Sequence, residues 1–267
     1  MHVLITGATG GIGKGVCESL AKDYPAIFPN LKLTITSSRD GDRLDHLVKQ
    51  LREHGPDVQG LSGDVTDPAV CEKLVHDAIR LQGDVHALVC VAGASGPGKL
   101  ESLPLEQWEL TFQLNVRSVW LMAKAAYASL KNTQGSVTAI ASMSGLHPHP
   151  GYGAYSPAKA ALIMLCRQLA QEWGEVGIRT NTVCPGMIRT PLTEAVYQVN
   201  SIKQQREALV PMKRIGRPDD IGEAVKYLIS PQASYVNGQN LIVDGGVADH
   251  MMSMIPGRPG KPPVDQS

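Results

Sequence analysis

Short apolar runs, rich in β-branched residues, alternate along this chain with longer segments of helical spacing. The runs are bounded by Gly, Pro, Asp or Ser, and they lie at Val3–Ile5, Leu31–Ile35, Ala87–Val91, Val137–Ile140, Thr180–Val183 and Leu241–Val243. Helical periodicity is clearest at Leu44–Leu51, Trp108–Leu130, Ala158–Trp173 and Asp219–Leu228. Continuous apolar runs are typical of parallel strands that helices cover on both faces. The alternation predicts one doubly wound α/β domain over residues 1–250 and a Pro/Gly-rich tail at residues 251–267.

Composition limits the partners and the compartment. Lys and Arg together number 25, the same as Asp and Glu, so there is no basic field to attract nucleic acid or an anionic membrane surface. No apolar run approaches the ~20 residues of a membrane helix, and the N-terminus does not resemble a signal peptide. The five cysteines never form a C-x-x-C pair. We therefore expect reduced thiols, a cytoplasmic location and a small-molecule partner.

A glycine cluster follows the first apolar run directly, at Thr6–Gly13. Glycines there allow a tight turn and a close approach to a pyrophosphate, and the next helix begins with free N–H groups. A glycine-rich turn without a ligand is the alternative, but the position between the first strand and the first helix favours a dinucleotide site. The predicted contacts are Gly7, Thr9, Gly11, Ile12 and Gly13.

The end of the second run bears on which dinucleotide binds. An acidic residue there would hold the ribose 2′-hydroxyl of NAD. This chain has Ser38 and Arg39, a hydroxyl and a guanidinium that suit the 2′-phosphate of NADP. Asp40 and Asp42 lie close by and could favour NAD instead, and Arg39 could simply be a solvated loop residue. We predict NADP(H), with NAD(H) left open.

The sequence Tyr155-Ser156-Pro157-Ala158-Lys159 is the strongest catalytic candidate. Pro157 is tolerated only in the first turn of a helix, so a helix should begin here. Tyr155 and Lys159 then share one face. A fixed ammonium and a helix N-terminus both favour phenolate, which predicts a lowered pKa for Tyr155. An exposed Tyr and Lys without function is the alternative.

Two further polar residues accompany this pair. Ser142 follows the run Val137–Ile140, where sheet enzymes of this class bind ligands, and its hydroxyl can hydrogen-bond a substrate oxygen. Asn115 lies inside a helical run although Asn forms helices poorly, which suggests a special role. A solvated helical Asn is the alternative.

In this order and spacing the motifs resemble those of the short-chain dehydrogenase/reductase family, over residues 1–250. They are Thr6–Gly13, Asp64-Val65, Asn115, Ser142, Tyr155–Lys159, Pro185-Gly186 with Thr190, Asn237-Gly238 and Val243–Gly246. The resemblance implies a Rossmann-type domain with a seven-stranded parallel sheet, no catalytic metal, and a homodimer or homotetramer. It also implies an NAD(P)-dependent oxidoreductase acting on an alcohol or a carbonyl compound.

The resemblance further implies roles for individual residues. Tyr155 would exchange a proton with the substrate oxygen, Ser142 would orient that oxygen, and Lys159 would hold the nicotinamide ribose. Asn115 would position a water that continues the proton path. The cofactor contacts implied elsewhere are Asp64 and Val65 at the adenine, Ala92 and Gly93 after the fourth run, and Pro185, Gly186, Ile188 and Thr190 toward the nicotinamide.

One motif departs from the family pattern. The family usually has Asn-Asn-Ala-Gly where this chain has Cys90-Val91-Ala92-Gly93. Backbone contacts to the cofactor can persist there, whereas the side-chain hydrogen bonds of the two Asn residues cannot. The departure puts local rigidity in question more than the chemistry.

Two other functions remain open from sequence. A nucleotide-sugar isomerase or dehydratase would share the Tyr and Lys but retain its cofactor. A nicotinamide-sensing protein would bind without turnover. His147 and His149, beyond Ser142, either contact a polar or acidic substrate or are loop residues without function.

Overall fold

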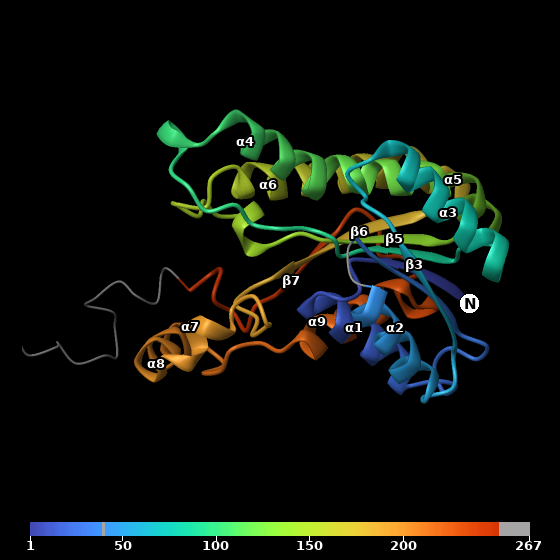
Figure 1. The fold of residues 1–267 in the computed structure, drawn as a ribbon, viewed down its shortest axis with the longest axis horizontal. Coiled ribbons are helices and arrows are strands. Elements are labelled where there is room, and N and C mark those ends of the chain that lie inside the picture. Colours follow the sequence, from blue (N-terminus) through green and yellow to red (C-terminus); the bar gives the residue numbers. More distant parts are fainter. Residues whose placement is uncertain (39–40, 251–267) are drawn as a thin grey trace, which may run out of the picture.

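Residues 1–38 and 41–250 are described by the computed structural model, and they form one parallel seven-stranded sheet between two layers of helices (Figure 1). The spatial order is β3-β2-β1-β4-β5-β6-β7. The strands are β1 His2–Thr6, β2 Lys32–Ser37, β3 Asp57–Ser62, β4 Ala87–Cys90, β5 Ser136–Ile140, β6 Arg179–Pro185 and β7 Asn240–Val243. The predicted doubly wound α/β fold is confirmed. The predicted tail at 251–267 lies outside the described residues.

Helices cover both faces of the sheet, and two short helices lie beyond its end. One face carries α1 Gly11–Lys22, α2 Gly41–Arg52 and α9 Pro218–Ile229, and the other carries α3 Pro68–Gln82, α4 Leu105–Phe112, α5 Ser118–Thr133 and α6 Tyr155–Trp173. The helices α7 Glu194–Gln198 and α8 Asn200–Leu209 extend past the ends of the strands (Figure 1). Single-turn helices are η1 Leu100–Ser102, η3 Met143–Gly145, η4 Gly174–Val176 and η5 Pro231–Ala233, and η2 Gln113–Arg117 is a π-helix.

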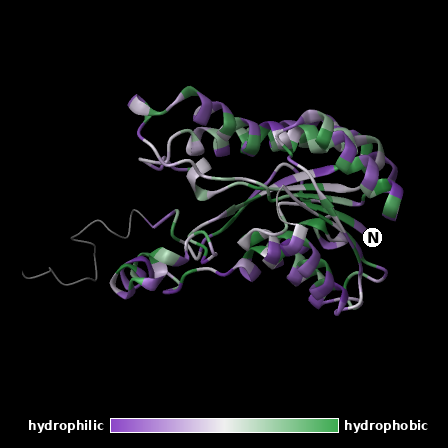
Figure 2. Cartoon of the chain, viewed as in Figure 1, coloured by the Kyte–Doolittle hydropathy of each residue, from purple (hydrophilic) through white to green (hydrophobic). Residues whose placement is uncertain are grey.

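Each helix layer has its own apolar core against the sheet. On one side Val16, Leu20 and Val225 pack toward the strands, and on the other side Met122 and Leu162 do so, all with no more than 1% exposure. The hydropathy colouring shows mostly apolar strands at the centre of the sheet, between helices that carry both polar and apolar residues (Figure 2). Fully burying one such side chain stabilises the fold by roughly 1.5–3 kcal/mol, so the two cores hold the strand ends in fixed positions.

The pattern of apolar runs does not predict strand β3. Its sequence, Asp-Val-Gln-Gly-Leu-Ser, alternates in polarity, and only Val58 is buried. It pairs with β2 alone, at the edge of the sheet, where polar side chains are tolerated. An edge position thus explains the absence of the continuous apolar run that marks the inner strands.

The strand order reverses between β1 and β4, which pair in parallel with Ile5 opposite Val89. The chain leaves these neighbours in opposite directions, and the loops after them separate to form a crevice at the carboxyl ends of the strands. Ligands bind at such points in sheets of this type. In the described part of the chain, no helix is both long enough and apolar enough to cross a bilayer.

Candidate active site

The glycine loop lies at the crevice between β1 and β4 and packs closely against its wall. Gly7 has φ +68°, and a Cβ added to it would lie 2.6 Å from the backbone nitrogen of Ala92. A Cβ on Gly13 would lie 2.1 Å from the carbonyl oxygen of Gly7. Any larger residue would therefore push the loop out of the crevice. Ala92 and Gly93, the cofactor contacts that the family resemblance implies after the fourth run, follow β4 on the other side of the same crevice.

Helix α1 presents an open N-terminus to this crevice. Its N-cap residue is Gly10, which offers no side chain to its first N–H groups, and its first turn holds no acidic residue. Gly11 and Ile12 are the first two residues of the helix. An N-terminus of this kind attracts a phosphate through free N–H groups and the helix dipole. The loop and helix therefore fit the pyrophosphate of a dinucleotide.

The next strand end carries the residues expected at the adenosine ribose. The hydroxyl of Thr9 hydrogen-bonds that of Ser37 at 2.8 Å, which ties the glycine loop to the end of β2. Ser38 follows and is exposed. Arg39 and Asp40 lie outside the described residues. Asp42 stands in the first turn of α2, beside this strand end.

On the far side of β2, the turn after β3 holds the predicted adenine contacts. The Asp64 carboxylate accepts hydrogen bonds from the backbone N–H and the hydroxyl of Thr66, at 2.9 and 2.8 Å. Val65 is buried, and its carbonyl accepts from the Cys71 thiol. These contacts hold both residues in the turn.

Asn115 lies in the π-helix η2 and is fully buried. Its amide nitrogen donates to the carbonyls of Ala94 and Thr111 at 3.0 and 2.9 Å. Its Oδ1 has no hydrogen-bond partner among the described residues. A single π turn in a longer helix often marks a functional position, and an unpaired buried carbonyl can accept a water. The predicted continuous helix over Trp108–Leu130 is divided here into α4, η2 and α5.

Lys159 is the second buried group. Its Nζ donates to the carbonyl of Ile140 at 2.7 Å, and it has no acidic partner among the residues described. Burial lowers the pKa of Lys159 to about 8. A Cβ on Gly93 would lie 2.8 Å from Asn115 Oδ1 and 3.3 Å from Lys159 Nζ. The glycine therefore keeps a small space open between these two groups.

Tyr155 is the first residue of α6, as the position of Pro157 predicted. Burial raises the pKa of Tyr155, and a hydrogen bond from Ser142 opposes this only in part. The predicted lowering of the Tyr155 pKa is therefore wrong for the protein alone. Lys159 Nζ lies 5.7 Å from the Tyr155 ring centre and its charge is itself disfavoured by burial, so the ammonium does not offset the desolvation of the phenol.

The loop after β6 closes the crevice on its remaining side. Gly186 donates its N–H to Val243 at 3.0 Å, and a Cβ on it would meet the Asp244 side chain at 2.5 Å. Ile188 is held by a parallel bridge to Gly216. Thr190 lies against the glycine loop, with its Cβ 2.6 Å from a Cβ built on Gly11. Pro185 ends β6 just before this loop.

Residues beyond Ser142 form a small aromatic group that sequence reasoning only partly identified. The His149 ring stacks on Tyr152, with centroids 3.8 Å apart, and hydrogen-bonds Ser144 at 3.0 Å. The Tyr152 ring centre is 6.4 Å from that of Tyr155. His149 was a candidate from sequence, whereas Tyr152 and Ser144 were not. The only signal for Tyr152 is an aromatic residue three positions before Tyr155, which is common at random.

The cysteines are not nucleophiles in this arrangement. All five are buried and unpaired, and burial raises the pKa of Cys90 and of Cys184. A thiol with a raised pKa is protonated and unreactive at neutral pH. Within the described ranges, no group of three or more potential metal ligands is found.

The comparisons with known proteins agree on one family. A family model described as enoyl-(acyl carrier protein) reductase matches residues 7–248. Dehydrogenase/reductase SDR family member 4 from Bos taurus is 32% identical over 250 residues, which cover 93% of this chain and 87% of that protein.

Solved structures of other proteins are similar to this chain in fold and in sequence identity. A single-substitution variant of actinorhodin polyketide ketoreductase, solved with NADPH, superposes with a TM-score of 0.86 at 29% identity and covers 93% of this chain and 97% of that one. The Pseudomonas aeruginosa RhlG/NADP active-site complex superposes with a TM-score of 0.84 at 28% identity, covering 92% and 96%.

Proposed function

Because this chain belongs to the short-chain dehydrogenase/reductase family, we propose that it is an NADP(H)-preferring oxidoreductase. Its substrate is a carbonyl compound or a secondary alcohol, and Tyr155 is the general acid and base. Family membership supports the oxidoreductase class. The preference for NADP(H), the role of Tyr155 and the type of substrate are what we propose beyond it. A bound nicotinamide dinucleotide supplies the hydride.

The observation that carries the proposal is the burial of Lys159 without an acidic partner, beside Tyr155 and the unpaired Asn115 Oδ1. A buried amine that only stabilised the fold would be expected to form an ion pair, because an unpaired buried charge is costly. Strongly perturbed groups of this kind cluster at functional sites. The glycine cradle and the open end of α1 fit a dinucleotide at the same crevice.

Each side chain then has one task. Tyr155 donates its proton to the substrate oxygen as the alcohol forms, and Ser142 hydrogen-bonds that oxygen and orients it. Lys159, held by the Ile140 carbonyl, binds the nicotinamide ribose. Asn115 Oδ1 accepts a water that returns a proton toward Lys159. The raised pKa of Tyr155 keeps the phenol protonated at neutral pH, which supports reduction as the working direction.

Turnover tests the assignment. A panel of ketones and secondary alcohols is offered with NADPH and NADH, or with the oxidised cofactors, and absorbance at the nicotinamide band is followed. We expect net consumption of NADPH with at least one ketone. Product formation without net consumption would favour the isomerase or dehydratase, and tight NADPH binding without turnover across the panel would favour the sensing protein.

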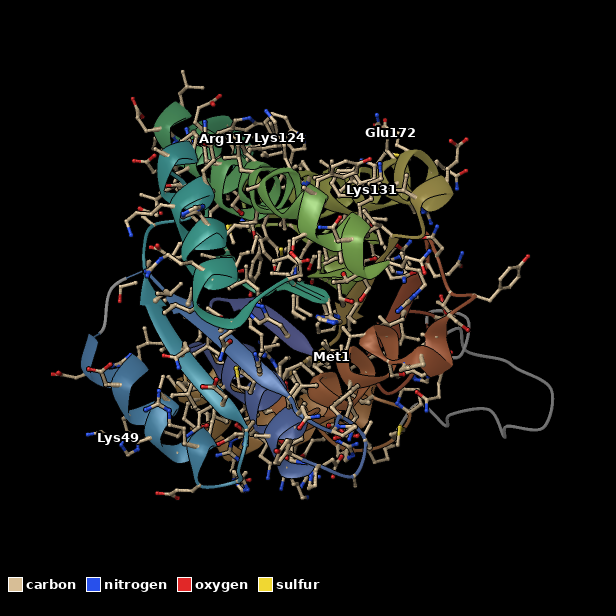
Figure 3. The ribbon with its side chains drawn as sticks, turned by 90° about the vertical axis from the view of Figure 1, so that its right-hand side faces the viewer. Met1, Lys49, Arg117, Lys124, Lys131 and Glu172 are labelled. Carbon is tan, nitrogen blue, oxygen red and sulfur yellow. The ribbon has the colours of Figure 1, made fainter. Side chains whose placement is uncertain are left out.

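The cofactor preference has its own test at Arg39. Arg39→Asp replaces the guanidinium proposed for the 2′-phosphate with a repelling charge, so NADPH affinity should fall by at least tenfold, with little change for NADH. Lys49→Asp, at an exposed position of α2 (Figure 3), makes the same charge change and serves as the control. Unchanged NADPH affinity in Arg39→Asp would contradict the preference.

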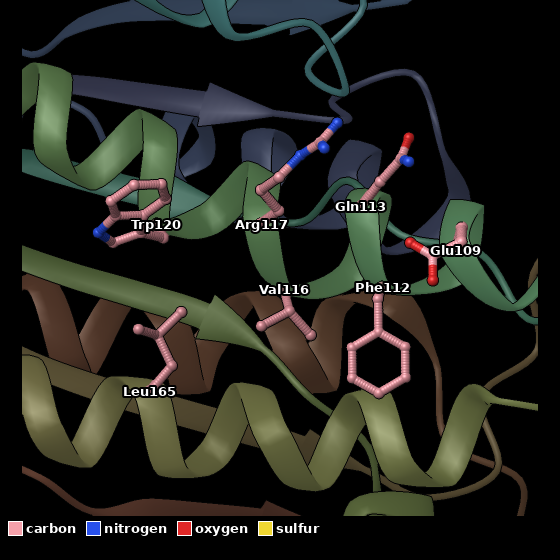
Figure 4. A pocket seen from close by; sticks show the side chains of 7 residues that line it. All are labelled: Glu109, Phe112, Gln113, Val116, Arg117, Trp120 and Leu165. Carbon is pink, nitrogen blue, oxygen red and sulfur yellow. The ribbon is translucent and has the colours of Figure 1, made fainter.

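We extend the proposal to a homodimer or homotetramer in the cytoplasm. The outer face of α4, α5 and α6 exposes Leu110 at 53%, Trp120 at 42% and Met164 at 59%. The same face holds a cavity of about 440 Å³ with none of the predicted site residues; its lining is made of apolar Phe112, Val116, Trp120 and Leu165 together with polar Glu109, Gln113 and Arg117 (Figure 4). Exposed apolar groups of this kind are typical of an interface.

Solution mass tests the assembly. The full chain should sediment as a dimer or tetramer. Leu110→Glu should lower the mass of the particle in solution, whereas Leu192→Glu, a change at an exposed residue on a different surface, should not.

The buried thiols, none of which forms a disulfide, support the cytoplasmic location. Fractionation of cells that express the tagged full chain tests it, and recovery in a membrane or secreted fraction would contradict it.

A further inference from the structure

Arg117 joins two parts of the molecule that both carry predicted site residues. It is the last residue of the π-helix η2, which also holds Asn115. Its Nη2 donates a hydrogen bond to the carbonyl oxygen of Thr66 at 2.7 Å, although the two residues are 51 positions apart. Thr66 belongs to the turn after β3 that carries Asp64 and Val65. One side chain thus connects the helix of Asn115 with the turn proposed to contact adenine.

The turn after β3 receives limited support from the strand before it. β3 lies at the edge of the sheet, and within this strand only Val58 is buried. The hydrogen bonds from Thr66 to the Asp64 carboxylate set the internal shape of the turn. They do not fix its position against the rest of the molecule. The bond from Arg117 does so, because η2 lies in a different layer of the fold.

The Arg117 side chain is enclosed where it makes this contact. It leaves η2 on the side opposite Val116 (Figure 4). Its Nε is buried and has no hydrogen-bond partner among the described residues. A hydrogen bond from an ionised donor is stronger than a neutral one, and more so away from water. An unpaired buried donor lowers stability, so an arginine that only stabilised the fold would be expected to have this group satisfied.

The position of the adenine half follows from the arrangement of the crevice. Lys159 and Tyr155 lie beyond the end of β5, so the nicotinamide half extends to that side of the α1 N-terminus. The adenosine half then extends over the ends of β2 and β3. Thr9 hydrogen-bonds Ser37, and the Ser37 carbonyl accepts from the N–H of Gly63 at 3.0 Å. These bonds continue one rim from the glycine loop to the turn that Arg117 holds.

Resting on the dinucleotide site of the proposed function, we propose that Arg117 is a positioning residue for the adenine half of the cofactor. It acts through the Thr66 carbonyl, which keeps the turn of Asp64 and Val65 in place against the adenine. Asn115, on the same π-helix, faces the space that Gly93 leaves beside the buried amine. The helix η2 therefore supports both ends of the cofactor site.

Binding of the adenine half alone tests this role. The full chain is titrated by calorimetry with NADPH, with ADP-ribose and with its 2′-phosphate, which lack nicotinamide. Arg117→Met should raise the Kd of NADPH, and of whichever ADP-ribose compound the wild type binds more tightly, by about tenfold. That factor is the lower end of the range for a hydrogen bond to a charged group. With a ketone that the wild type reduces, KM for NADPH should rise by the same factor while kcat is retained.

Conservative variants address the fold. Arg117→Lys keeps a donor of similar reach, so it should restore most of the affinity for the adenine half. If Arg117→Met does not fold, Arg117→Gln, with a shorter polar side chain, replaces it in the same titrations.

The matched control is an arginine that binds the other end of the same strand. Arg52 donates from two nitrogens to the carbonyl of Val58 near the start of β3, at 2.9 and 2.5 Å. Arg52→Met should lower the thermal midpoint, as Arg117→Met does, without a change in the Kd of NADPH or of the ADP-ribose compounds.

The outcomes separate this inference from the reductase function. Unchanged affinity for the adenine half in Arg117→Met, or the same loss in Arg52→Met, would overturn the positioning role and leave the reductase function standing. A wild type that binds NADPH but reduces no ketone would overturn the reductase function, and the titrations would still decide the role of Arg117. A wild type that binds neither ADP-ribose compound would overturn the positioning role.

Discussion

Two groups of buried polar side chains, at opposite ends of the same sheet, differ in how their hydrogen bonds are satisfied. At the amino ends of the strands, Thr34 hydrogen-bonds both His2 and Gln82, at 2.9 and 2.8 Å, and Gln82 continues to the Asp57 carbonyl. Figure 3 looks onto this end, with Met1 between the two helix layers. At the carboxyl ends, Lys159 and Asn115 are buried as deeply, but each retains an atom or charge without a partner among the described residues.

The difference separates stability from function. A buried polar network whose members are all satisfied rigidifies a fold, whereas an unsatisfied group lowers stability and persists when a ligand uses it. We therefore expect substitutions at the amino end to change stability without changing turnover. Substitutions at the carboxyl end should lower turnover while leaving stability unchanged or higher. The predictions below test that contrast, beginning with the largest effect.

Removing the Tyr155 hydroxyl should give the largest change. Tyr155→Phe is expected to lower kcat by about 10²- to 10⁴-fold, the usual range for general acid–base catalysis, with NADPH affinity retained. Its thermal midpoint should not fall, because the hydroxyl lost is a desolvated one. Tyr152→Phe, three residues earlier, is the matched control and should retain turnover. Comparable kcat values for the two variants would contradict the assignment of Tyr155.

Removing the buried amine should stabilise the fold and abolish turnover together. Lys159→Met keeps a chain of similar length without a charge to desolvate, so the free energy of unfolding at pH 7 should rise by about 3 kcal/mol. Lys124→Met, which removes an exposed amine over Trp120, should change neither the free energy of unfolding nor turnover. Urea unfolding and turnover are measured on each, and a destabilised Lys159→Met would show that the amine supports the fold.

The same variant predicts a pH dependence whose sign follows from the pKa of Lys159. That pKa is about 8 in the fold against an ordinary 10.5, so between these values the unfolded chain binds more protons and wild-type stability rises with pH. Below pH 8 both states are protonated and the penalty is complete. The stability gain of Lys159→Met should be constant up to about pH 8 and shrink toward pH 10.5. A gain that grows with pH would contradict the lowered pKa.

At the amino end of the strands, Thr34→Val is expected to have a smaller effect than the changes at Tyr155 and Lys159, and it tests the hydrogen-bond network directly. Valine keeps the shape and leaves His2 and Gln82 each without one partner, which should cost about 2 kcal/mol of unfolding free energy. Turnover of the folded protein should be unchanged. Thr138→Val is matched to it, since Thr138 is also fully buried in a strand but its hydroxyl has no partner in the described part of the chain. That change should be neutral or stabilising, and equal losses would refute the network interpretation.

The sequence by itself determined the features that depend on local spacing. Alternating apolar runs indicated the doubly wound sheet, and the glycine loop marked the first crossover. Pro157 indicated a helix that begins near Tyr155, with Lys159 four residues further along on the same face. Each of these follows from the geometry of a few consecutive residues. The polar edge strand β3 was the exception, because its pairing with β2 is set by the whole sheet rather than by its own pattern.

Only the tertiary structure decided the electrostatics of the site. The spacing of Tyr155 and Lys159 favours phenolate, but burial by the packed sheet and helices desolvates both groups and reverses the direction of the Tyr155 pKa. The unpaired Asn115 Oδ1 appears only once its helix widens by a π turn. Desolvation and long-range contact depend on what surrounds a residue in space, which local spacing does not record.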